Sequence, residues 1–218
     1  MLRSLSLAVV CTLVGLVGST ALAADAPDLS TPKKAASAFA KAVEANNIDA
    51  AKSASVGSDE DYKLVQAIGA FIASARELRD ASVAQFGEAG KGISNDELSN
   101  LSKQVEASDE KITGDTATLG KPEEHDPMKL KKVDGNWKVD LASIPDKDQM
   151  GKALPKMQKV MTTAATEIKS GKYKNVDEAK QAIGQQMFAV VAEQLNPDAA
   201  KGSKTAPAVK PQGGDEKK

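Results

Sequence analysis

Apolar residues recur at helical spacing soon after the N-terminus of the chain. Ser30 or Thr31 can cap a helix, and Pro32 suits its first turn. Asn46 and Asn47 tolerate left-handed backbone, so we predict that this helix ends there. A shorter helix is expected from Ile48 to Val56. The face of the first helix that we expect to be buried consists of Ala35, Phe39, Ala42 and Val43.

The longest helix is predicted to begin at Ser58 and to end at Gly87. Its apolar stripe comprises Tyr62, Val65, Ile68, Phe71, Ile72, Ala75, Leu78, Val83 and Phe86. A glycine-rich loop is expected from Gly87 to Ser94, and one or two further helical turns from Asn95 to Leu101.

From about Lys103 the pattern changes to alternation of polar and apolar residues, which is typical of strands. We expect one strand through Val105 and Ala107 to Lys111, and another that begins at Ala117. Met128 to Leu141 predicts a hairpin, in which Asp134-Gly135-Asn136 forms the turn and Trp137, Val139 and Leu141 share one face. These strands predict an antiparallel meander with one buried face.

Two helices are expected after the meander, from Asp148 to Ser170 and from Val176 to Leu195, and Pro155 should kink the first or mark its start. The apolar stripe of the second comprises Ala179, Ala182, Ile183, Met187, Val190, Val191 and Leu195. The predicted class is α+β, with N-terminal helices including one long helix packed on the meander, followed by a C-terminal helical hairpin. The expected organisation is a signal peptide (1–23), an α+β cone-like domain (24–145), the hairpin (146–196) and a disordered tail (197–218).

The N-terminal segment predicts export. Arg3 precedes an almost uncharged apolar run, and Ala21-Leu22-Ala23 fits a signal-peptidase site, so we place cleavage after Ala23. An uncleaved membrane anchor is the alternative, because the run is nearly long enough to span a bilayer. Cys11 lies inside the run, and cleavage therefore leaves a chain without thiols, which excludes disulfides and cysteine-ligated metals.

Charge and aromatic content narrow the classes of partner. Without Arg3 the chain carries 28 basic and 30 acidic residues, a formal net charge of −2. No stretch combines dense basic residues with aromatics, so we expect no nucleic-acid binding and no bulk affinity for polyanions.

The order of these elements, and above all MKLKKVDGNWKVDL at Met128–Leu141, resembles the nuclear transport factor two-like (cystatin-like) superfamily, in particular its small exported members of unassigned role. The resemblance covers roughly Ser30 to Leu141. It implies a curved sheet that wraps the long helix into a cone, whose mouth often binds a small apolar ligand. The helical hairpin after Ile144 is additional to that pattern.

Candidate sites in the sequence favour structural roles. His125, within Glu123-Glu124-His125-Asp126, is a metal or acid–base candidate, but no second histidine completes a zinc set. For isomerases or dehydratases the resemblance implies an acid–base pair, which here would be Tyr62 with Asp61. Trp137 could serve as a ligand platform. A role in the hydrophobic core explains Tyr62 and Trp137 better. Gly87–Gly92 lacks the ending of a phosphate-binding loop. Met150, Met157, Met161 and Met187 fit a core or an adaptable binding surface.

From these residues we assign no catalytic, cofactor-binding or metal site, and the ligand-binding residues stay unknown. The favoured hypothesis is an exported (periplasmic or extracellular) non-enzymatic domain that binds a small apolar ligand or a protein partner through the cone or the hairpin. No cofactor and no stable membrane anchor after cleavage are expected. The alternatives are an enzyme with a general acid or base in the cone, and a homodimer formed by the last two helices.

Overall fold

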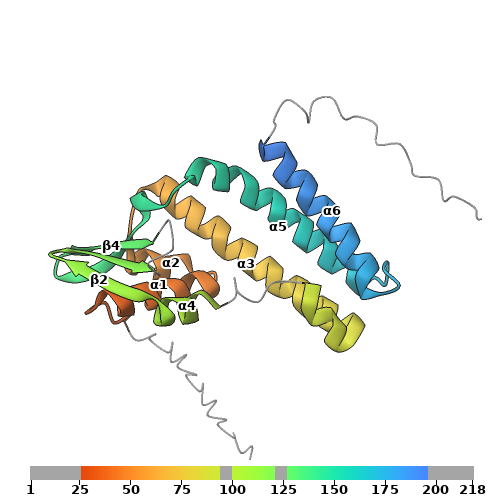
Figure 1. Cartoon of the computed structure of the whole chain (residues 1–218), viewed down its shortest axis with the longest axis horizontal. Helices are drawn as coiled ribbons and strands as arrows, with labels where there is room; N and C mark the ends of the chain where they lie inside the picture. Colours follow the sequence, from red (N-terminus) through yellow and green to blue (C-terminus); the bar gives the residue numbers. More distant parts are fainter. Residues whose placement is uncertain (1–25, 94–99, 121–126, 196–218) are drawn as a thin grey trace, which may run out of the picture.

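Helix α3, Asp59–Phe86, connects a layer of helices and strands to a helical arm (Figure 1). The computed structural model describes residues 26–93, 100–120 and 127–195, so the predicted signal peptide, tail and His125 lie outside the described residues. At 28 residues, α3 is about 42 Å long. The other elements are α1 (Pro32–Glu44), α2 (Ile48–Ser53), β1 (Ser55–Val56), the 3-10 helix η1 (Gly87–Ile93), α4 (Leu101–Ala107), β2 (Asp109–Thr113), β3 (Thr116–Gly120), β4 (Met128–Val133), β5 (Asn136–Asp140), the 3-10 helix η3 (Leu141–Ser143), α5 (Lys147–Lys169) and α6 (Val176–Leu195).

The five strands form one sheet in the order β1-β5-β4-β3-β2. All neighbours are antiparallel except β1 and β5, which are parallel. Asp134 and Gly135 both have positive φ, 50° and 80°, as a two-residue hairpin turn requires. The α+β class and the Met128–Leu141 hairpin are therefore confirmed.

The first hydrophobic core lies between the sheet and the N-terminal helices. Its sheet side consists of Ala117, Leu119, Leu130, Trp137 and Val139. Helix α1 packs on this face through contacts with β3 and β5, and the first half of α3 adds Val65 and Ile72 to the core. Of the two residues predicted to cap α1, Thr31 is the N-cap. Asn46 lies after the end of α1 in the predicted left-handed conformation, with φ 53°.

A second hydrophobic core holds the helical arm together. Leu78 and Ala81 from the second half of α3 meet Ala164, Ala165 and Ile168 of α5. Ala179 and Ile183 of α6 complete this core, together with Tyr173 in the α5–α6 connection. One long helix therefore serves two cores. Its stripe does not lie wholly beneath the Trp137 hairpin, because the second half of α3 packs against α5 instead.

Three predictions about local structure were wrong. Val105 and Ala107 belong to helix α4 and not to a strand. Helix α4 packs along α1, and in the first turn of α4 the Ser102 N–H donates to Glu44 Oε1 at 2.7 Å. Ser55 and Val56 form β1 rather than helix, because their backbone completes the edge beside β5. The expected Gly87–Ser94 loop is the 3-10 helix η1 as far as Ile93.

Candidate interaction site

The inner face of the sheet, where the resemblance implies a ligand-binding cone, is filled by side chains. Leu130, Val139 and Trp137 are 1%, 3% and 6% exposed. The main-chain N–H of Trp137 donates to the carbonyl of Leu29 at 3.0 Å, and the Lys132 ammonium lies 5.9 Å from the Trp137 ring. Trp137 is therefore a core anchor that also holds the segment before α1.

Tyr62 and Asp61, the predicted acid–base candidates, both contribute to the packing around the start of α3. Tyr62 packs against the first core, and its hydroxyl donates to the carbonyl of Ser55 at 3.4 Å. Asp61 is only 6% exposed. It completes a capping box with Ser58, whose N–H and hydroxyl each donate to Asp61 Oδ2 at 2.9 Å.

Asp61 also forms an ion pair that the sequence did not predict. The Lys147 ammonium, at the start of α5, donates to Asp61 Oδ1 at 2.6 Å. This hydrogen bond, with that from the Ser58 N–H, lowers the pKa of Asp61 below its ordinary 3.8 although burial acts in the opposite direction. A carboxylate stabilised in this way is a weak base. Its geometry suits the joining of two helix ends and not proton transfer.

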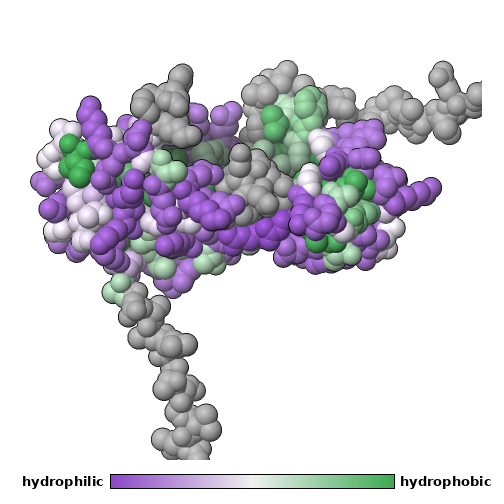
Figure 2. Space-filling view, turned by 60° about the horizontal axis from the view of Figure 1, so that its bottom comes forward, coloured by the Kyte–Doolittle hydropathy of each residue, from purple (hydrophilic) through white to green (hydrophobic). Residues whose placement is uncertain are grey.

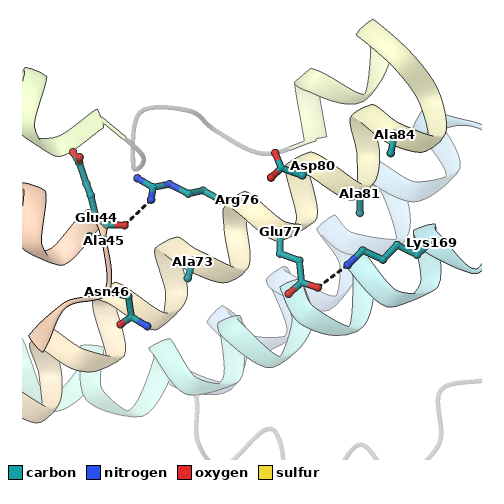
Figure 3. A pocket seen from close by; sticks show the side chains of 10 residues that line it. All are labelled: Glu44, Ala45, Asn46, Ala73, Arg76, Glu77, Asp80, Ala81, Ala84 and Lys169. Carbon is teal, nitrogen blue, oxygen red and sulfur yellow. Dashed lines mark hydrogen bonds and ion pairs between the residues drawn. The ribbon is translucent and has the colours of Figure 1, made fainter. Parts of the chain in front are cut away.

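A cleft of about 590 Å³ opens between the end of α1, α3 and α5 (Figure 3). Its charged groups are already engaged. Arg76 donates to the carbonyl of Glu44 at 2.6 Å, and the Lys169 ammonium donates to Glu77 Oε1 at 2.7 Å. The cleft lies in the size range of ligand sites, but Arg76, Glu77 and Lys169 are each bonded to another group of the chain, so we assign it no ligand.

Tyr173 and Glu167 form a polar pair at the connection from α5 to α6. The Tyr173 hydroxyl donates to the Glu167 carboxylate, and Lys172 donates to its other oxygen. Burial, followed by this hydrogen bond, raises the pKa of Tyr173 to about 12. The hydrogen bond from Lys172, followed by that from Tyr173, lowers the pKa of Glu167. The pair fastens the connection to α5, so we assign it a structural role.

An apolar strip on α6 is a surface feature of the described residues that packing does not explain. Phe188 is 73% exposed and Val191 is 39% exposed. Gly184 lies one turn before Phe188, and a Cβ added to it would meet nothing within 4 Å. We call Gly184, Phe188 and Val191 the α6 strip; their spacing puts them on one helix face. Figure 2 shows hydrophobic surface beside the point where the C-terminal residues leave α6.

The sequence prediction had found only one face of α6. Ala179 and Ile183 are buried against α5 as expected, whereas Val191, assigned to the same stripe, belongs to the exposed strip. The spacing of Gly184, Phe188 and Val191 was the signal that could have revealed a second apolar face. Met161 and Met187 pack against the second core, and Met150 and Met157 are half-buried.

Three further observations bear on function. Among the described residues, no three histidine, cysteine or carboxylate side chains lie close enough to bind a metal ion together. No helix in the described ranges has the length and apolar character needed to cross a bilayer. Comparison with known proteins found no matching protein family, no matching curated protein and no matching solved structure.

Proposed function

We propose that this chain is an exported, non-enzymatic interaction protein that associates with a second copy of itself through the α6 strip. The observation that carries the proposal is the exposure of Phe188, at 73%. A Phe side chain offers a large apolar surface, and its removal from water stabilises an interface by about 1.5–3 kcal/mol. Single exposed apolar residues are ordinary, but Phe188 shares its helix face with Val191 and a glycine.

The strip has the shape that a two-fold interface needs. In such an interface the same patch of both copies meets itself, so a projection must face a hollow on the same patch. Gly184 provides the hollow, because the space around its Cα is open. Two antiparallel α6 helices that cross between residues 184 and 188 would place each Phe188 over the partner's Gly184.

Gly184 supports this arrangement on energetic grounds as well. Glycine within a helix costs about 1 kcal/mol relative to alanine, and no described contact of Gly184 within the chain requires its small size. An interface that needs close approach of two helices gives a physical reason for a glycine there. The proposal favours a protein partner over a small ligand, because side chains fill the inner face of the sheet.

The test is the subunit count of residues 24–218 by native mass spectrometry and sedimentation velocity at micromolar concentrations. We expect a dimer, and we expect Phe188→Glu to yield a folded monomer because it places a charge in the apolar contact. The matched control is Ile112→Glu, which alters another exposed apolar residue, on β2 (53% exposed), and should leave the dimer intact.

Gly184→Leu provides a second variant. It fills the hollow while favouring helix, so it should weaken the dimer without loss of helical circular dichroism. A wild-type monomer would overturn the proposal, as would a dimer that survives both α6 substitutions. A wild-type monomer that dimerises after removal of residues 197–218 would show that the tail covers the strip in place of a second copy.

A further inference from the structure

The outer face of the sheet, opposite the first core, carries most of its lysines. Directly paired residues point to the same side of a sheet, so the register defines two rows on this face. One row contains Thr113, Thr116, Lys131 and Lys138, and the other contains Lys111, Thr118 and Lys129. We call these seven residues the lysine–threonine face.

Few carboxylates balance these four lysines. Asp140 lies on the same face, and its Oδ1 is 3.2 Å from the Lys131 ammonium. Asp109 lies on the edge strand β2, two residues before Lys111, and therefore points to the same face. Within the described residues, Lys111, Lys129 and Lys138 have no carboxylate at ion-pair distance. Lys131 and Lys138 are paired directly across β4 and β5, a like-charge arrangement that destabilises a sheet.

We propose that the lysine–threonine face binds an acidic polysaccharide, a polymer that carries carboxylate or sulfate groups among hydroxyls. Asp140 forms an ion pair with Lys131, but among the described residues Lys138 has no carboxylate at ion-pair distance, so a bound anion would relieve the repulsion between the two lysines. The threonine hydroxyls can both donate to and accept from sugar hydroxyls. Neighbouring strands lie about 4.8 Å apart, so the lysines form a closely spaced array that suits repeated charges along a chain.

Other polyanions suit this face less well. Trp137 points to the inner side, and the described part of the outer face has no aromatic side chain on which a nucleic-acid base could stack. The face is built on paired strands and has no large apolar side chain among its seven residues to enter a lipid layer. The inference is independent of the α6 strip, which lies on the helical arm.

This proposal differs from one expectation from the sequence. The near-neutral total charge predicts no bulk affinity for polyanions, but alternation along β4 and β5 collects lysines on one side and apolar residues on the other. The average therefore hides a local excess of positive charge.

The test uses affinity electrophoresis and calorimetry of residues 24–218 with polygalacturonate and dextran sulfate, and with neutral dextran as the reference. We expect binding to the two acidic polymers that weakens as salt rises, because counterions are released on binding. The triple variant Lys129→Gln, Lys131→Gln, Lys138→Gln should lose affinity by at least about tenfold, the effect of 1.4 kcal/mol. The control is Lys63→Gln, Lys91→Gln, Lys159→Gln, with the same change in charge on helical surfaces, and it should bind like the wild type.

Thr118→Val separates sugar recognition from charge alone. It keeps every lysine and removes one hydroxyl between Lys111 and Lys129, so we expect a several-fold loss of affinity for the acidic polymers. Equal affinity of the wild type and the lysine triple variant would overturn the site. Binding to single-stranded DNA or to phosphatidylserine vesicles as tight as that to the acidic polymers would overturn the polysaccharide assignment, as would an unchanged Thr118→Val variant.

Discussion

The ammonium of Lys147 lies 2.6 Å from Oδ1 of Asp61 and thereby fixes the start of α5 to the start of α3. The two residues are 86 positions apart in the chain. Asp61 is nearly buried, while the Lys147 side chain is 32% exposed, so the carboxylate is the partner that depends more on the pair. Ser58 fixes the same carboxylate from the other side.

We predict that Asp61→Asn lowers the free energy of unfolding by about 1–3 kcal/mol, since it removes the charge from a capping box and leaves Lys147 without its carboxylate. Urea denaturation at pH 7 measures the change. Asp59→Asn, in the same first turn but exposed, is the matched control and should cost less than about 1 kcal/mol. Equal effects of the two substitutions would contradict a special role for Asp61.

The contribution of Asp61 should depend on pH. Its pKa is lower in the folded protein than the ordinary 3.8, so the stabilisation is fully present above the pKa of the unfolded chain and is lost as pH falls through the folded-state pKa. The stability difference between the wild type and Asp61→Asn should therefore be constant near neutral pH and shrink below about pH 4. A difference that stays constant into strong acid would show that the charge of Asp61 is irrelevant.

The Tyr173 hydroxyl should ionise at a higher pH than an ordinary tyrosine. Burial and Glu167 raise its pKa to about 12, so the tyrosinate absorbance at alkaline pH should include a component near that value, and Tyr173→Phe should remove it. Because the folded state keeps Tyr173 neutral, its stabilisation is present below the ordinary value of 10.0 and is lost as pH rises towards 12. A Tyr173→Phe protein whose stability changes with pH in this window as the wild type does would contradict the assignment.

Gly90 should tolerate no side chain. A Cβ at Gly90 would lie 2.2 Å from the carbonyl oxygen of Ser82, a backbone atom of α3 that cannot move aside easily. We expect Gly90→Ala to destabilise the protein by about 1–3 kcal/mol in thermal or urea denaturation. Gly92→Ala is the matched control, because its Cβ would meet only the flexible end of Lys180 at 3.2 Å. Similar stability of the two variants would show that η1 does not pack on α3 at Gly90.

Local signals predicted the helix ends and the hairpin well, because the responsible residues act on their own backbone. Thr31, Asn46, Ser58 and the Asp134–Gly135 turn all have the predicted roles. The α4 region was predicted wrongly because its helix is stabilised from outside: Glu44 bonds to its first turn, and α1 packs along it. No short window of sequence contains such partners.

The candidate surfaces were less predictable than the fold. Phe188 was overlooked because Ala179, Ile183 and their neighbours already formed a sufficient stripe on α6, and only the position of α5 shows which face remains exposed. The Asp61–Lys147 pair joins two helix ends, and periodicity carries no information about which ends meet. His125 stays a prediction, because it lies outside the described residues.

The parallel pairing of β1 with β5 sets the order in which the molecule can be completed. Ser55 and Val56 leave the ribosome early, but their partners Val139 and Asp140 are translated only after the rest of the sheet. Until then α1 can pack only on α2, α3, α4 and β3, and the core around Phe39 and Val43 lacks the Trp137 and Val139 side chains of β5. Completion of the first core must therefore wait for β5, and a chaperone that holds apolar segments during this interval would protect the chain from aggregation.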